Sequence, residues 1–127
     1  MTTPAAPADA PVGPAYRYRA TCLRVVDGDT LVIRVDLGFN CKIDVHARLA
    51  GVNAPELHGD TSLAGLASKA QLEDLLRLAE LDGPLLVESH KGARSFERWV
   101  VDVWTVDGAS VARMMVEGGS AVWVDRP

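Results

Sequence analysis

Residues 30–50, TLVIRVDLGFNCKIDVHARLA, set the architecture of this chain, because two runs of alternating side chains flank a short connection through Gly38. In the first run the apolar side chains occupy every second position: Leu31, Ile33, Val35 and Leu37. In the second run they do the same: Cys41, Ile43, Val45, Ala47 and Leu49. Alternation with a period of two is typical of strands that bury one face. The stretch therefore predicts two consecutive antiparallel strands.

Further strands are expected on both sides of this pair. Tyr16–Val26 is rich in aromatic and β-branched residues, so it predicts a strand that completes an antiparallel meander. Later in the chain, Leu85–Ser89 and Arg98–Val106 predict two more strands, and Ala121–Val124 predicts a short last one. Five main strands of this kind favour a small barrel.

A helix is expected in the proline-free stretch from Ser62 to Leu81. Its apolar residues repeat at i, i+3, i+4 and i+7, the spacing of one helical face: Leu72, Leu75, Leu76 and Ala79. Glu73 and Arg77 lie on the opposite side and are ordered for an i,i+4 ion pair. Asp60 or Thr61 precedes the helix as a cap.

Together these elements predict a mainly β (α+β) domain, an OB-type five-stranded Greek-key barrel with the long helix between strands 3 and 4. A short helix is expected near the C-terminus, around Val111–Met115 and before Gly118-Gly119. An SH3-like barrel is the competing architecture on pattern alone. The length of 127 residues allows one domain, which we expect at 16–127 after a disordered Pro/Ala-rich tail at 1–15.

Composition narrows the class of protein. No apolar run approaches the roughly 20 residues of a membrane helix, so no membrane partner is expected. The two cysteines, Cys22 and Cys41, fit no zinc or redox motif and are expected as small buried residues in a reducing compartment. We expect a monomer in the cytoplasm, or a secreted protein if a signal peptide had been removed. The net charge of −4 weighs against tight non-specific DNA binding.

Three short segments carry candidate functional residues. Asp27-Gly28-Asp29 is either an ordinary turn or a carboxylate at a loop that faces a hard cation such as Ca²⁺. Arg48, Asn53 and Glu56 lie at and just after a strand end, which is either a solvated end or a cluster of guanidinium, amide and carboxylate. Arg98 enters a strand, where its planar guanidinium could grip two phosphate oxygens. Trp99, Trp104 and Trp123 are expected in the core rather than as base-stacking residues.

Taken together and in order, these segments resemble the micrococcal-nuclease (thermonuclease, staphylococcal-nuclease-like) family. The resemblance rests on Asp-Gly-Asp-Thr at 27–30, on Arg48 followed seven positions later by Pro55-Glu56, and on the aromatic-x-Arg of residues 96–98. It runs from about Tyr18 to Val124. It implies a metal-dependent nuclease that hydrolyses phosphodiester bonds of DNA and RNA with little sequence preference.

The resemblance also implies roles for individual residues. Arg48 and Arg98 would bind the scissile phosphate, and Glu56 would orient or deprotonate the attacking water. Phe96 and Arg94 would contact the substrate. A single Ca²⁺ ion would be held by the residues at these positions: Asp29, Asn53, the backbone carbonyl of Ala54, and Asp27 as outer support.

Asn53 replaces an acidic ligand of that family, so weak calcium binding is expected. The alternative is a catalytically weak or inactive OB-fold module that binds single-stranded nucleic acid or protein.

Overall fold

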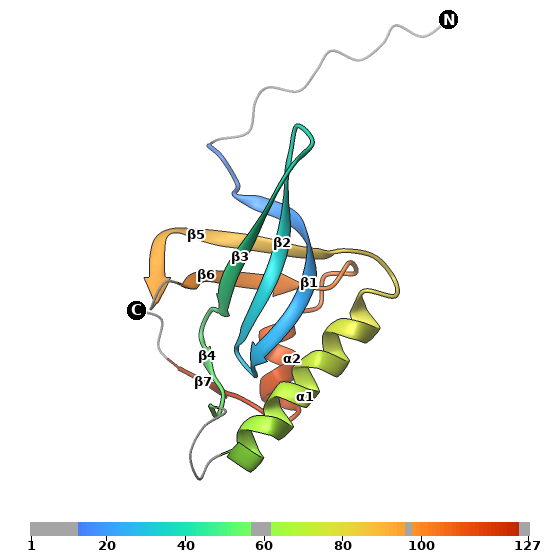
Figure 1. The fold of residues 1–127 in the computed structure, drawn as a ribbon. Helices are drawn as coiled ribbons and strands as arrows, with labels where there is room; N and C mark the ends of the chain where they lie inside the picture. The colour runs from blue at the N-terminus through green and yellow to red at the C-terminus, as the bar shows by residue number, and fades with distance from the viewer. Residues whose placement is uncertain (1–12, 57–61, 96–97, 125–127) are drawn as a thin grey trace, which may run out of the picture.

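The computed structural model describes residues 13–56, 62–95 and 98–124. In chain order its elements are β1 (Arg17–Asp27), β2 (Thr30–Gly38), β3 (Cys41–Leu49), β4 (Val52–Asn53), α1 (Ser62–Ala79), β5 (Leu85–Ser95), β6 (Arg98–Trp104), α2 (Val111–Glu117) and β7 (Val122–Trp123). The long strands close into a barrel in the order β1-β2-β3-β6-β5, and β4 pairs with β7 outside it (Figure 1). The prediction of a mainly β domain with a five-stranded barrel and helices is confirmed. The predicted cap at Asp60 or Thr61 lies outside the described residues.

The β2–β3 hairpin forms in the register that its alternating pattern requires. Leu31 lies opposite Ala47 and Ile33 opposite Val45, and these side chains point into the barrel, where Leu31, Ile33 and Ala47 are fully buried. The intervening residues point outward. A slip of one residue would exchange the two sets, so burial of the apolar set fixes the register.

Strand β1 closes the barrel because it bends. Its first part, Arg17–Ala20, pairs with β5, and Arg19–Asp27 pairs with β2 through two register shifts. Such bulges bend a strand and increase its twist. On the other side, β3 and β6 run parallel, with Arg48 opposite Val100. This pairing brings the start of β6 close to the hairpin.

Helix α1 packs on the barrel through the predicted face, with Leu72 and Leu76 buried in the core. Next to its C-terminal end, Glu80 Oε1 accepts a hydrogen bond from the Cys22 backbone N–H at 2.7 Å. The predicted ion pair is wrong: Arg77 binds Asp74 at 3.0 Å. Residues three apart are also neighbours on a helix surface, and both members of this pair are exposed.

The two cysteines differ in exposure. Cys22 is half-buried, and Cys41 is exposed beside the β2–β3 turn, so the prediction that both are buried is wrong for Cys41. Burial, together with the charge of Glu80, raises the pKa of the Cys22 thiol to about 11. That thiol therefore stays protonated and unreactive at neutral pH.

Two of the tryptophans are not core residues. Trp99 is 41% exposed and Trp123 is 58% exposed, so the core prediction is wrong for both. Trp123 lies on the small β4–β7 sheet outside the barrel. Trp99 lines an open apolar pocket of about 240 Å³ with Tyr18 and Val45. Within the described residues, no helix has the length and apolar character needed to cross a membrane.

Candidate functional site

Asp29 lies in the turn between β1 and β2, and only 5% of its surface is exposed. Its Oδ2 forms an ion pair with Arg48 Nη1 at 2.7 Å and accepts a hydrogen bond from the Ala54 backbone N–H at 3.0 Å. Its Oδ1 accepts a hydrogen bond from the Thr30 hydroxyl at 2.9 Å. A buried carboxylate is tolerated only when it is paired and hydrogen-bonded, and these donors meet that requirement.

Arg48 points outward from β3 and is held on several sides. Besides the contact with Asp29, its Nη2 donates to the Val52 carbonyl at 3.2 Å and to Asn53 Oδ1 at 2.7 Å. These bonds fold the segment after β3 back onto the strand. Because a guanidinium is planar, fixing several of its N–H groups also fixes its orientation.

Arg98, the first residue of β6, reaches the same cluster. Its Nη1 donates to the Thr30 hydroxyl at 3.0 Å, and that hydroxyl in turn donates to Asp29. The structure therefore brings Asp29, Arg48, Asn53 and Arg98 together, although up to 69 residues separate them in the chain.

Thr30 is the member of this cluster to which the sequence analysis gave no role. It is a polar residue that is 2% exposed, and it lies directly opposite Arg48 in the hairpin. The register of the predicted hairpin could have identified Thr30 as a neighbour of Arg48, because directly opposite residues on one face of an antiparallel pair are in contact.

The other predicted residues differ in what the structure describes of them. Asp27 is half-buried at the end of β1, and its backbone pairs with that of Thr30. Glu56 is exposed in the segment after β4. The backbone of Arg94 belongs to β5, but its side chain lies outside the described part of the structure, as does Phe96.

Gly28 allows the turn that carries Asp29 to lie close to its neighbours. A Cβ atom at this position would lie 2.6 Å from Ser68 Cβ on α1 and 2.9 Å from Ala54 Cβ. Neither neighbour is the flexible end of a long side chain. The position therefore requires a glycine for close approach rather than for an unusual backbone angle.

We expect Gly28→Ala to lower the free energy of unfolding by about 1–3 kcal/mol, the range for inserting atoms into a packed region. Urea denaturation followed by circular dichroism measures this change. An unchanged stability of Gly28→Ala would contradict the packing described here.

The oxygens predicted to bind calcium already accept hydrogen bonds in this arrangement. Both Asp29 oxygens and Asn53 Oδ1 are bound to Arg48, Thr30 or Ala54. In the part of the chain that the structure describes, no group of three or more His, Cys, Asp or Glu residues could hold a metal ion. The oxygens are of the kind that Ca²⁺ prefers, but the one carboxylate among them is paired with a cation. A calcium ion bound to Asp29 would share this carboxylate with Arg48.

Comparison with known proteins assigns no family to the chain. It matches no family model and has no significant match among the curated proteins. The structure itself defines the class: a mainly β protein with a closed five-stranded barrel. On that barrel a buried carboxylate, Asp29, is ion-paired with Arg48 and is linked to Arg98 through the Thr30 hydroxyl.

Proposed function

We propose that this chain is a metal-dependent nuclease that hydrolyses phosphodiester bonds of DNA or RNA with little sequence preference, built on an OB-type Greek-key barrel. The convergence of Arg48 and Arg98 on the Asp29–Thr30 pair carries this proposal. Two guanidinium groups close together suit a phosphodiester, because each can grip two phosphate oxygens. They also stabilise the negative charge that develops in the transition state.

The remaining roles follow from residue chemistry. Glu56 is exposed and is the proposed base for the attacking water. Asp29, Asn53 and the Ala54 carbonyl, supported by Asp27, would hold a weakly bound Ca²⁺ ion. When bound, such an ion polarises a phosphate oxygen. Arg94 and Phe96 remain proposed substrate contacts.

The resting arrangement suggests how substrate enters. Arg48 is paired with Asp29, so an arriving phosphate competes with that carboxylate for the guanidinium. Arg98 donates to the Thr30 hydroxyl, and a phosphate that binds Arg98 would compete with that hydroxyl for the guanidinium.

Incubation of the purified chain with heat-denatured DNA, with Ca²⁺ or with a chelator, tests the proposal directly. The expected result is degradation in Ca²⁺ that the chelator abolishes. Equal degradation in both samples would contradict the metal dependence. No degradation in either would contradict the hydrolytic activity itself.

A second candidate function is a binding module without hydrolysis. It is favoured by one observation: Arg48 is already ion-paired with Asp29 and hydrogen-bonded to the Val52 carbonyl and Asn53, so it is less available to phosphate than a free cation. This alternative predicts saturable binding of single-stranded nucleic acid and no product at any metal concentration.

A further inference from the structure

The outward face of β1, β2 and β3 carries basic side chains between the candidate site and the β2–β3 turn. From the site toward the turn, the outward cross-strand pairs follow in this order: Thr30 with Arg48, Val32 with His46, Arg34 with Asp44, and Asp36 with Lys42. On the neighbouring strand, Arg19 lies opposite Asp36. Arg19, Arg34, Lys42 and His46 are called the basic track below. Strand β2 has nine residues, so at about 3.3 Å per residue the hairpin spans about 30 Å.

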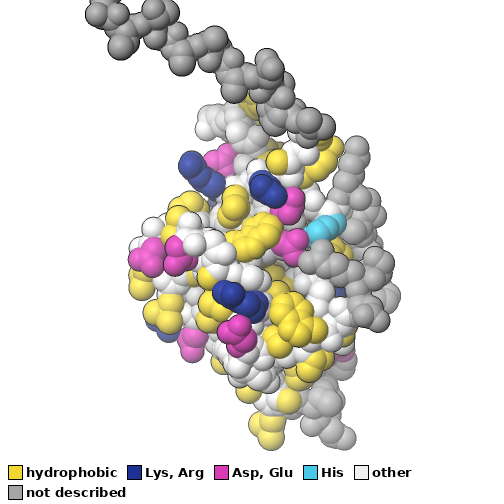
Figure 2. Space-filling view, turned by 180° about the vertical axis from the view of Figure 1, so that it is seen from behind, with side chains coloured by type: hydrophobic (Ala, Val, Ile, Leu, Met, Phe, Trp, Pro, Cys, Tyr) yellow, Lys and Arg dark blue, Asp and Glu magenta, His cyan; other side chains and the backbone are white. Residues whose placement is uncertain are grey.

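The negative net charge of the chain arises outside these strands. Residues 17–48 contain six Lys or Arg and four Asp or Glu, whereas residues 49–127 contain seven and twelve. On the face seen in Figure 2, basic and acidic side chains are intermingled and form no single patch. Residues 17–48 therefore carry two more positive than negative side chains, whereas the whole chain has a net charge of −4.

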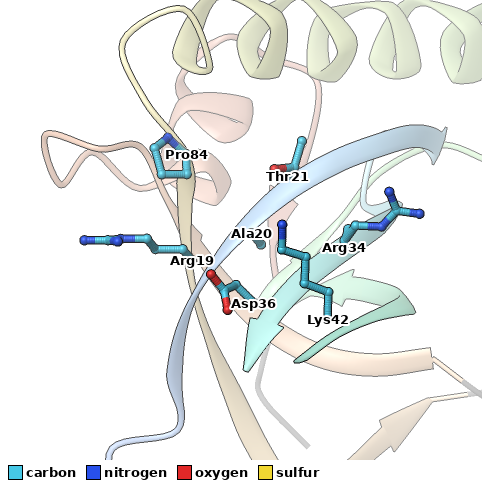
Figure 3. A pocket seen from close by; sticks show the side chains of 7 residues that line it. All are labelled: Arg19, Ala20, Thr21, Arg34, Asp36, Lys42 and Pro84. Carbon is cyan, nitrogen blue, oxygen red and sulfur yellow. The ribbon is translucent and has the colours of Figure 1, made fainter. Parts of the chain in front are cut away.

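A pocket of about 180 Å³ lies in the middle of the track, and Figure 3 shows Arg19, Lys42 and Arg34 extending around it from neighbouring strands. Among the described residues, Arg19 and Lys42 have no ion-pair partner. Arg34 binds both oxygens of Asp44, at 2.8 and 3.1 Å. Asp36 accepts a hydrogen bond from the Gly38 backbone N–H at 2.9 Å. Two cations on this face are therefore available to phosphate.

An aromatic side chain, Phe39, lies in the β2–β3 turn at the end of the basic track. Phe39 and Asn40 form the two-residue turn of the hairpin with φ angles of 53° and 60°, the sign that type I′ turns require at both positions. A bulky residue is strained at such an angle, where Asn or Gly is preferred. Phe39 is also 101% exposed. The stability of the β2–β3 turn therefore does not explain why a phenylalanine occupies position 39.

We propose that the basic track and Phe39 bind a single strand of nucleic acid that continues from the candidate site along the β2–β3 hairpin. This inference rests on the proposed nuclease function. Arg19 and Lys42 contact backbone phosphates, and an unpaired base stacks on the Phe39 ring. Cations that follow the backbone, combined with an aromatic stacking surface, are the features that bind single strands without regard to sequence. A duplex keeps its bases paired and cannot stack one on Phe39.

Fluorescence anisotropy with a labelled oligothymidylate of about 12 nucleotides, within the roughly 4–16 that one OB barrel covers, tests the proposal. A chelator prevents hydrolysis during the measurement. Phe39→Gly should raise Kd about 5- to 10-fold without lowering Tm, because glycine adopts a positive φ freely. Phe39→Tyr keeps the ring and should bind within about two-fold of the original chain.

The charged part of the track is tested by salt dependence. Arg19→Ala/Lys42→Ala should lower the slope of log Kd against log salt by about 1.4, which is about 0.7 for each lost phosphate contact to a single strand. Arg113→Ala, on α2, removes an exposed cation outside the track and should leave the slope unchanged. Polyglutamate serves as a competitor, and it should displace the oligonucleotide poorly.

Three results would overturn the inference: no binding of the oligonucleotide, unchanged Kd and salt slope in the track variants, or equally effective displacement by polyglutamate, which would indicate an acidic protein partner. Hydrolysis of a dinucleotide, which is too short to reach the track, separates this inference from the proposed function. If the track alone is wrong, the dinucleotide is still cleaved. If the nuclease proposal alone is wrong, the binding differences persist without cleavage.

Discussion

Arg48→Ala is expected to lower the rate of hydrolysis of denatured DNA by about 10²-fold or more, the usual cost of removing one group that stabilises transition-state charge. It should also lower stability. Asp29 would lose a partner at 2.7 Å while remaining buried, and an unpaired buried charge costs about 3–5 kcal/mol. Because Thr30 and Ala54 still donate to Asp29, we expect the lower end of that range.

Initial rates and urea denaturation of the same preparations measure both effects. Arg77→Ala is the matched control, since Arg77 forms an exposed ion pair with Asp74 and such pairs contribute about 1 kcal/mol or less. The double variant Asp29→Ala/Arg48→Ala removes both charges and should be no less stable than Arg48→Ala alone. A stable and fully active Arg48→Ala variant would refute both the site and its proposed role.

Glu56→Gln is expected to reduce the rate by about 10²- to 10⁴-fold, the contribution of a positioned general base. Glu56 is exposed, so the free energy of unfolding should change by no more than about 0.5 kcal/mol. The rate of hydrolysis at saturating substrate, with a thermal melt of each sample, measures the two quantities. Glu117→Gln, an exposed glutamate on α2, should leave the rate unchanged.

The two substitutions differ in a way that tests the structure as well as the chemistry. Arg48 is part of a buried hydrogen-bonded cluster, so its loss should affect rate and stability together. Glu56 is exposed, so its loss should affect the rate of hydrolysis and leave the stability unchanged. Retained activity in Glu56→Gln would show that Glu56 is not the base, whereas hydrolysis by another group would remain.

Local patterns in the chain were sufficient to predict the elements that bury one face. The period-two runs predicted β2 and β3, and the spacing of Leu72, Leu75 and Leu76 predicted α1, because burial of a continuous apolar face follows directly from side-chain periodicity. The end of α2 at Gly118 was also predicted from the sequence. Strand β5 was predicted as Leu85–Ser89 but extends to Ser95. Residues 90–95 lack alternation, and the end of this extension, Arg94 and Ser95, pairs with β6.

The candidate site shows the same division between local and long-range information. Residue types and order identified Asp29, Arg48 and Arg98 as members, but not the contacts between them. Barrel closure places Arg98 against Thr30. The register of the β2–β3 hairpin places Arg48 beside Asp29, and the segment after β3 folds back so that the Ala54 N–H reaches Asp29. These contacts join residues that are distant in the chain. Side-chain periodicity reports which face of a strand is buried, whereas the partner across the barrel depends on register and closure, which emerge only when all the strands pack together.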